Sequence, residues 1–171
     1  MAMYHRSFRN LQVDYIDFYL LHAIGGGGME LFNKRFIQNG MLDFLIEERS
    51  RGRIRHLGWS FHGDIEVFNR VSEMHDRIHW DFVQIQLNYV DWRHASAYNA
   101  DWQKAMGDDT NAEYLYEELA ERDIPVVVME PLLGGRLASV TQNVLAQMKQ
   151  NARKTVPPHG RFASPGLFRR C

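Results

Sequence analysis

Cysteine is almost absent from this chain of 171 residues, because the single one, Cys171, is the last residue. One thiol cannot form an internal disulfide framework or a cysteine-based metal cluster. The histidines also lack the spacing that is typical of metal ligands. We therefore expect neither a disulfide scaffold nor a metal site.

Long apolar runs are missing as well. No stretch approaches the roughly 20 apolar residues that a membrane-spanning helix needs. The residues that follow the N-terminus are polar and contain no apolar core of a signal peptide. We therefore expect a cytoplasmic protein without a membrane partner.

Acidic residues are missing from the last part of the chain. None occurs after Glu130, whereas residues 131–171 hold seven basic residues. A basic segment can bind nucleic acid, but no aromatic interleaving or nucleic-acid motif accompanies it, so we expect no nucleic-acid partner. Residues 151–171 contain three prolines and no periodicity. This composition predicts an irregular or disordered basic tail after a domain at residues 1–150.

Four short apolar runs stand out in what the sequence does contain. Each is rich in β-branched or aromatic residues and is bounded by polar or turn residues, as in a buried strand. The four runs are Tyr15–Leu21, Arg53–Trp59, Asp81–Leu87 and Pro125–Met129. Asp17, on the outward face of the first run, should have a partner, which the sequence does not name.

Amphipathic patterns predict helices before, between and after these runs. They cover Tyr4–Leu11, Met41–Ser50, Asp64–His75, Ala112–Arg122 and Ser139–Gln150. Gly52 stands where a helix C-terminal glycine belongs, Asp64 suits an N-cap, and Thr110 with Glu113 forms a capping-box pattern.

The alternation of strands and helices predicts an α/β fold with a parallel sheet and right-handed crossovers. Such a pattern suits a (β/α)₈ barrel or a doubly wound sheet. A complete barrel needs about 250 residues, so four βα units would make about half of one. We therefore expect a partial (β/α)₈ barrel with parallel strands.

Four stretches of the sequence carry a family resemblance. Asp14 to His22 reads Asp-Tyr-Ile-Asp-Phe-Tyr-Leu-Leu-His, and Gly52 to Ser60 reads Gly-Arg-Ile-Arg-His-Leu-Gly-Trp-Ser. Val83 to Tyr89 reads Val-Gln-Ile-Gln-Leu-Asn-Tyr, and Val128 to Leu137 reads Val-Met-Glu-Pro-Leu-Leu-Gly-Gly-Arg-Leu. In this order and spacing they resemble the aldo-keto reductases, over roughly residues 6 to 150.

The resemblance implies a (β/α)₈ barrel that binds NADPH or NADH without a Rossmann fingerprint. It also implies that a small aldehyde or ketone is reduced to an alcohol, with a tyrosine, a lysine, an aspartate and a histidine as the catalytic residues. The four predicted strands resemble the fourth to the seventh of that barrel.

His22 closes the first predicted strand. Alternation places Ile16, Phe18, Leu20 and His22 on one face, which would fill the barrel and leave His22 at the carboxyl end of the strand, where barrel enzymes keep their active sites. The resemblance implies that His22 is the catalytic histidine. The alternative is a histidine that makes a structural hydrogen bond at a strand end.

Ser60 follows the second predicted strand, Gln84 lies within the third, and Met129 closes the fourth. The resemblance implies that Ser60 and Gln84 hydrogen-bond the nicotinamide carboxamide and that Met129 takes the place of a ring-stacking tyrosine. Phe61 departs from the asparagine that many members carry. The alternatives are a serine that caps the helix after it and a buried glutamine bonded to backbone.

Leu132 and Gly134 belong to a glycine-containing loop after the last predicted strand. The resemblance implies that this loop approaches the cofactor's pyrophosphate, where backbone amides can hold phosphate. A plain turn is the alternative. The glycines at 25–28 do not have the spacing of a phosphate fingerprint, and a flexible loop at the active site is the better interpretation.

The tyrosine, lysine and aspartate of the family come from strands that would precede residue 1. We therefore expect the chain as given to be truncated and weakly active or inactive as an NAD(P)H-dependent reductase. The alternative is a non-catalytic half-barrel that associates with itself or with another chain through its exposed strand edges.

Overall fold

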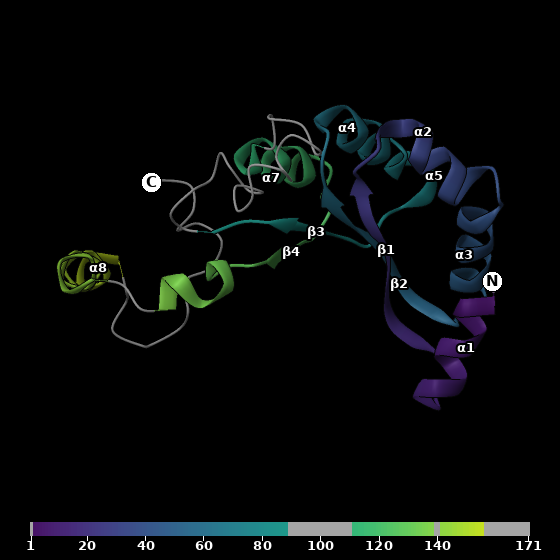
Figure 1. Cartoon of the computed structure of the whole chain (residues 1–171), viewed down its shortest axis with the longest axis horizontal. Coiled ribbons are helices and arrows are strands. Elements are labelled where there is room, and N and C mark those ends of the chain that lie inside the picture. Colours follow the sequence, from purple (N-terminus) through teal and green to yellow (C-terminus); the bar gives the residue numbers. More distant parts are fainter. Residues whose placement is uncertain (1, 89–110, 139–140, 156–171) are drawn as a thin grey trace. The chain divides into compact units, whose positions relative to one another are not determined.

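The structure is a computed structural model that describes residues 2–88, 111–138 and 141–155. Its sheet has four parallel strands in the order β1-β2-β3-β4 (Figure 1). The strands are β1 (Ile16–Gly25), β2 (Ile54–His62), β3 (Phe82–Gln86) and β4 (Val126–Met129). All four predicted strands are present, and the α/β fold with parallel βα units is confirmed.

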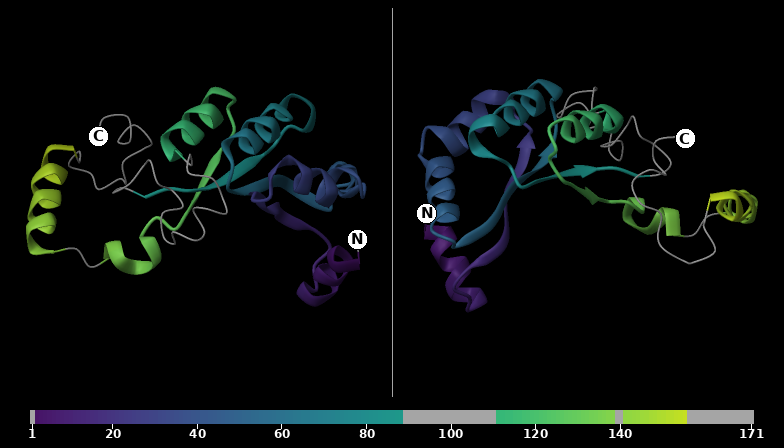
Figure 2. Two further views of the ribbon diagram at one scale, coloured as in Figure 1. Left: turned by 45° about the horizontal axis from the view of Figure 1, so that its top comes forward. Right: turned by 180° about the vertical axis from the view of Figure 1, so that it is seen from behind.

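The helices of the first part of the chain gather on one side of this sheet, as Figures 1 and 2 show. They are α1 (Ala2–Leu11), α2 (Gly28–Phe32), the π-helix η1 (Asn33–Ile37), α3 (Met41–Ser50), α4 (Ile65–Glu73), α5 (His75–Ile78) and α7 (Ala112–Glu121). The predicted helix at 64–75 is in fact split between α4 and α5, and no pattern had predicted α2 or η1. None of the described helices is long and apolar enough to cross a bilayer.

Helix ends test the predicted caps. The Asp64 carboxylate accepts a hydrogen bond from the Glu66 amide at 2.8 Å, which confirms that Asp64 is the N-cap of α4. Gly52 adopts φ 75° just after α3, as predicted for a glycine at a helix C-terminus. The N-cap of α7 is Asn111, whose side chain accepts from the amide of Glu113. The prediction of Thr110 as cap was therefore wrong, and Thr110 itself lies outside the described residues.

A second compact unit begins at Leu132. It contains the 3₁₀-helix η2 (Leu133–Ala138) and α8 (Gln142–Thr155). Helix α8 continues through residues 151–155, five residues into the segment predicted to be irregular. Residues 156–171 lie outside the described residues.

The hydrophobic core lies between the sheet and its helices. Trp59, Phe61, Val83 and Ile85 point from β2 and β3 toward the helices and are almost fully buried. On the opposite face, Phe18 is 65% exposed and rests on the ring of His56, with 4.9 Å between ring centroids. The predicted alternation is therefore present, and among the described residues the face that carries Phe18 is left largely uncovered by helices.

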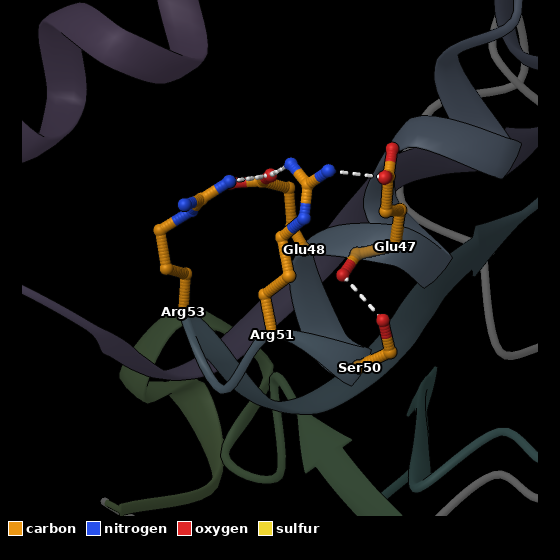
Figure 3. Close-up of polar contacts among 5 residues, drawn as sticks. All are labelled: Glu47, Glu48, Ser50, Arg51 and Arg53. Carbon is orange, nitrogen blue, oxygen red and sulfur yellow. Dashed lines mark hydrogen bonds and ion pairs between the residues drawn. The ribbon is translucent and has the colours of Figure 1, made fainter.

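Side chains with charges gather at the amino ends of the strands. Glu48, at the end of α3, is completely buried and accepts hydrogen bonds from the guanidinium of Arg53, which precedes β2. Arg51 bonds the carboxylate of Glu47 and lies 3.5 Å from that of Glu48 (Figure 3). Burial, with the Glu48 carboxylate beside it, strongly raises the pKa of Tyr4 on α1.

Two further arginines continue this pattern. Arg49 donates to the carbonyl of His79 at 2.7 Å and to the Asp81 carboxylate at 2.9 Å. Arg55 on β2 pairs with Asp17 on β1 at 2.7 Å, so Arg55 is the partner that the sequence predicted but could not name. Ion pairs thus join β1 to β2, and α3 to the residue before β3.

Candidate active site

The carboxyl end of β1 contains an irregularity at His22. Leu21 pairs with Trp59 and Ile24 pairs with Phe61, so two residues of β1 lie opposite the single residue Ser60 of β2. Such a bulge bends a strand and changes the direction of a side chain. Its second residue, Ala23, has φ 53°, which L-residues rarely adopt. The side chain of His22 is exposed at this bulge.

Polar contacts hold the backbone on both sides of His22. The amide of Ala23 donates to the hydroxyl oxygen of Ser60 at 2.9 Å. The guanidinium of Arg35, on η1, donates to the carbonyl of His22 at 3.0 Å. Beyond the bulge, a Cβ atom on Gly63 would lie 2.5 Å from the carbonyl carbon of Gly25, so only glycine fits this approach of two backbones.

Ser60 and Gln84 are direct partners in the pairing of β2 with β3. Side chains at paired positions of parallel strands point to the same face, so a hydroxyl and an amide lie next to each other there. Ser60 is buried and Gln84 is half-buried. The helix after β2 is capped by Asp64, so the alternative role for Ser60 as a helix cap is wrong.

Met129 closes β4 and is paired with Gln86 of β3. Its side chain is half-buried. The four residues His22, Ser60, Gln84 and Met129 thus come from four consecutive parallel strands. His22, Ser60 and Met129 lie toward the carboxyl ends of their strands, and Gln84, the middle residue of β3, is paired with Ser60.

Sequence reasoning missed a second polar group beside these residues. The side-chain amide of Gln86 donates to the carboxylate of Glu130 at 2.6 Å. His62 ends β2 on the same face as Ser60, and burial lowers its pKa below the ordinary 6.5. The nearby His22 lowers the pKa of His62 further, whereas Glu130 opposes the shift. Counting two residues on from Ser60 would have placed His62 on this face.

Backbone strain also marks this end of the sheet. Five residues other than glycine have positive φ in the described ranges. Gln12, His79 and Asp123 each follow a helix, where left-handed residues commonly end the last turn. Ala23 and Glu130, both with φ 53°, lie instead within or just after a strand. Strained residues of this kind are typical of functional sites.

Leu132 and Gly134 belong to the second unit. Gly134 and Gly135 have φ 62° and 93°, and a Cβ on either would meet nothing within 4 Å. The amides of Gly135 and Leu137 both donate to the carbonyl of Leu132, which makes the segment a defined turn. Its glycines leave room for close approach of a ligand. Among the described residues, no three histidine, cysteine or acidic side chains form a metal site.

The fold is shared with solved aldo-keto reductases. The structure is similar to the aldo/keto reductase of Brucella melitensis (17% identity, TM-score 0.55, covering 89% of this chain and 46% of that one). It also resembles an aldo-keto reductase from Klebsiella pneumoniae in complex with NADPH (20% identity, TM-score 0.56, covering 86% of this chain and 44% of that one). A third similar structure is an aldo-keto reductase from Bacillus halodurans in its holo form (22% identity, TM-score 0.53, covering 91% of this chain and 46% of that one). The chain thus spans less than half the length of these structures.

A match by sequence decides the family. No curated protein matches the chain. Residues 1–163, however, match the sequence model of the Aldo/keto reductase family. This match covers nearly all of the sequence and agrees with the partial barrel, so the chain belongs to the aldo/keto reductase family.

Proposed function

We propose that this chain forms part of an NADPH- or NADH-dependent reductase that converts aldehydes or ketones to alcohols. The observation that carries the proposal is that His22, Ser60 and Met129 lie toward the carboxyl ends of their parallel strands, and that Gln84 of β3 is paired with Ser60. Barrel enzymes build their active sites at this end of the sheet. The family match and the similarity to an enzyme in complex with NADPH support the choice of reaction.

The donor set fits a nicotinamide. A carboxamide offers one carbonyl acceptor and two N–H donors, and the paired Ser60 hydroxyl and Gln84 amide can each donate and accept. Met129 can pack against an aromatic ring through its thioether. When bound, the reduced nicotinamide supplies the hydride that reduces the carbonyl carbon. The backbone amides of the turn at Leu132 and Gly134 in the second unit are a separate candidate for phosphate binding.

His22 is proposed to orient the substrate. Its exposed imidazole can donate a hydrogen bond to the carbonyl oxygen, which gains negative charge as hydride adds to the carbon. Burial, together with the nearby His22, lowers the pKa of His62 and so favours its neutral form. A neutral second imidazole limits the positive charge that accumulates beside the substrate.

Binding of the cofactor is the first test. Titration of the purified chain with NADPH, followed by quenching of tryptophan fluorescence, should show saturable binding. Gln84→Ala should weaken it about tenfold, since it removes a polar pairing group from the site. Gln12→Ala is the matched control, because Gln12 is an exposed glutamine after α1. Absence of saturable binding would overturn the proposal.

Catalysis is the second test. We expect the chain to oxidise NADPH only weakly or not at all with a carbonyl substrate, because the tyrosine, lysine and aspartate that the resemblance implies have no counterpart identified in residues 1–171. Any weak activity should be lower in His22→Ala and unchanged in His5→Ala, which replaces an exposed histidine on α1. Equal rates in all three chains would assign no catalytic role to His22.

A second candidate function is supported by the uncovered face of the sheet. Phe18 is 65% exposed and Val127 is 43% exposed, on β1 and β4, which end the described sheet. Exposed apolar side chains next to open strand edges favour association. In this alternative the chain is a non-catalytic half-barrel that pairs with another copy. Sedimentation velocity should then show a discrete dimer that Phe18→Ser weakens, whereas a monomer at all concentrations would exclude it.

A further inference from the structure

The backbone directly after His22 is hydrogen-bonded to a side chain that lies 37 positions after Ala23 in the sequence. Ser60, on β2, is only 2% exposed, and its hydroxyl oxygen accepts the hydrogen of the Ala23 amide. This amide belongs to the residue directly after His22. The bond therefore connects the carboxyl end of β2 to the point where β1 departs from regular pairing.

The bulge needs such a bond because its geometry is unfavourable by itself. Ala23 has φ 53°, a conformation that L-residues rarely adopt. A half-buried amide also has to be paired, since an unpaired N–H loses its hydration without compensation. The Ser60 oxygen provides that pairing at the strained residue. Without it, we expect the segment to relax toward a more regular conformation.

The second contact at this segment is weaker. Arg35 donates to the carbonyl of His22 at 3.0 Å, but this bond is exposed to solvent. Water can replace an exposed hydrogen bond at small cost, whereas loss of one partner of a buried bond leaves the other unsatisfied. Ser60 should therefore control the position of His22 more strongly than Arg35 does.

We propose that Ser60 is a positioning residue for His22, and that it acts by fixing the Ala23 amide in the bulge that sets the direction of the imidazole. The importance of this direction for catalysis rests on the function proposed above, but the hydrogen bond itself does not. A serine oxygen that accepts from Ala23 still carries an O–H donor. One hydroxyl can therefore fix the backbone and face a cofactor at the same time.

The test compares two buried serines. Ser60→Ala removes the acceptor, whereas Ser72→Ala removes a hydroxyl on α4 that is equally buried and makes no hydrogen bond in the described structure. Hydrogen exchange should show the Ala23 amide exchanging about tenfold faster in Ser60→Ala than in the unmodified chain. The ring signals of His22 in an NMR spectrum should shift or broaden. Ser72→Ala should change neither.

Two outcomes contradict the proposal. A folded Ser60→Ala chain with unchanged Ala23 exchange and unchanged His22 signals overturns it. Weaker NADPH binding by that chain, with His22 unchanged, would leave Ser60 as a cofactor contact only. If no variant binds NADPH but the Ala23 and His22 signals respond to Ser60→Ala, the positioning role stands and the proposed reductase function fails.

A second variant covers the case in which Ser60→Ala does not fold. Ser60→Cys has nearly the same shape, and sulfur is a weak hydrogen-bond acceptor. Exchange of the Ala23 amide should then be faster than in the unmodified chain, with a smaller change in the His22 signals. A folded Ser60→Cys chain that is indistinguishable from the unmodified chain in both measurements contradicts the proposal.

Discussion

The two ends of the sheet are built in different ways. At the amino ends of the strands, Glu48, Arg53 and Asp81 take part in ion pairs that join helices to strands. At the carboxyl ends, Ala23 and Glu130 hold strained backbone conformations, His62 lies near His22, and the Gln86 amide donates to the Glu130 carboxylate. The first arrangement stabilises the fold, while the second gathers polar groups where the proposed function would bind a ligand. This division is typical of barrel enzymes, in which one end carries stability and the other carries chemistry.

The largest effect on stability is expected from Glu48→Gln. An amide cannot replace the charge that Arg53 and Arg51 meet in this buried position. The free energy of unfolding should fall by about 1–3 kcal/mol, since charge-assisted hydrogen bonds are lost while the arginines retain access to water. Glu47→Gln is the control, because its ion pair is half exposed and such pairs contribute little. Equal losses in urea unfolding of the two variants would contradict the division between the ends.

The stability of the chain at low pH should also depend on the Glu48 carboxylate. The hydrogen bonds from Arg53 lower the pKa of Glu48 below its ordinary 4.5 in the folded state. A carboxyl with a lowered folded pKa contributes stability that is fully present above pH 4.5 and is lost as pH falls through the folded value. The free energy of unfolding, measured from pH 7 to pH 3, should therefore fall more steeply for the unmodified chain than for Glu48→Gln. Parallel curves would show that Glu48 does not cause this decline.

Ala23→Gly should raise the free energy of unfolding, whereas Glu48→Gln should lower it. Glycine adopts φ 53° without the steric cost that alanine meets. The free energy of unfolding should rise by up to about 1 kcal/mol, because relief of strain exceeds the greater freedom of glycine in the unfolded chain. Ala112→Gly, in the first turn of α7, should instead lower stability. A loss of stability in Ala23→Gly would show that the bulge is not strained.

The smallest effect on stability is expected from His22→Ala. Because the imidazole is exposed, the free energy of unfolding should change by no more than about 0.5 kcal/mol. The pKa of His62 should nevertheless rise, since His22 no longer disfavours its charged form. NMR titration of the His62 ring measures this change directly. An unchanged pKa would place His62 and His22 too far apart to interact.

Much of this fold could be predicted from periodicity. The four strands and the helices at 41–50 and 112–122 follow patterns of apolar residues that burial in a core imposes. The π-helix η1, which carries the buried Phe36, was not predicted, because no apolar pattern in the sequence marked this segment as helical. Asp17 needed a partner, but only the register of β1 on β2 identifies it as Arg55.

The candidate site was predictable only in part. Alternation and the family resemblance predicted the strand positions of His22, Ser60, Gln84 and Met129, although their roles stay predictions. The bulge at Ala23 could not be foreseen, because alanine gives no local signal for positive φ. The bond between Gln86 and Glu130 joins the last residue of β3 to the residue after β4, and only the pairing of β3 with β4 brings them together.

The close approach of Gly25 and Gly63 has a consequence for reading mutational scans of this chain. A Cβ on either residue would lie under 3.0 Å from backbone atoms of the other strand end, so substitutions there would be poorly tolerated. Gly25 lies three residues after His22 at the end of β1, and Gly63 directly follows His62 at the end of β2. Intolerance at these two glycines would report crowding of main chains, and it would not by itself identify a ligand contact. Residues that tolerate change in folding assays but not in binding assays are the better markers of the site.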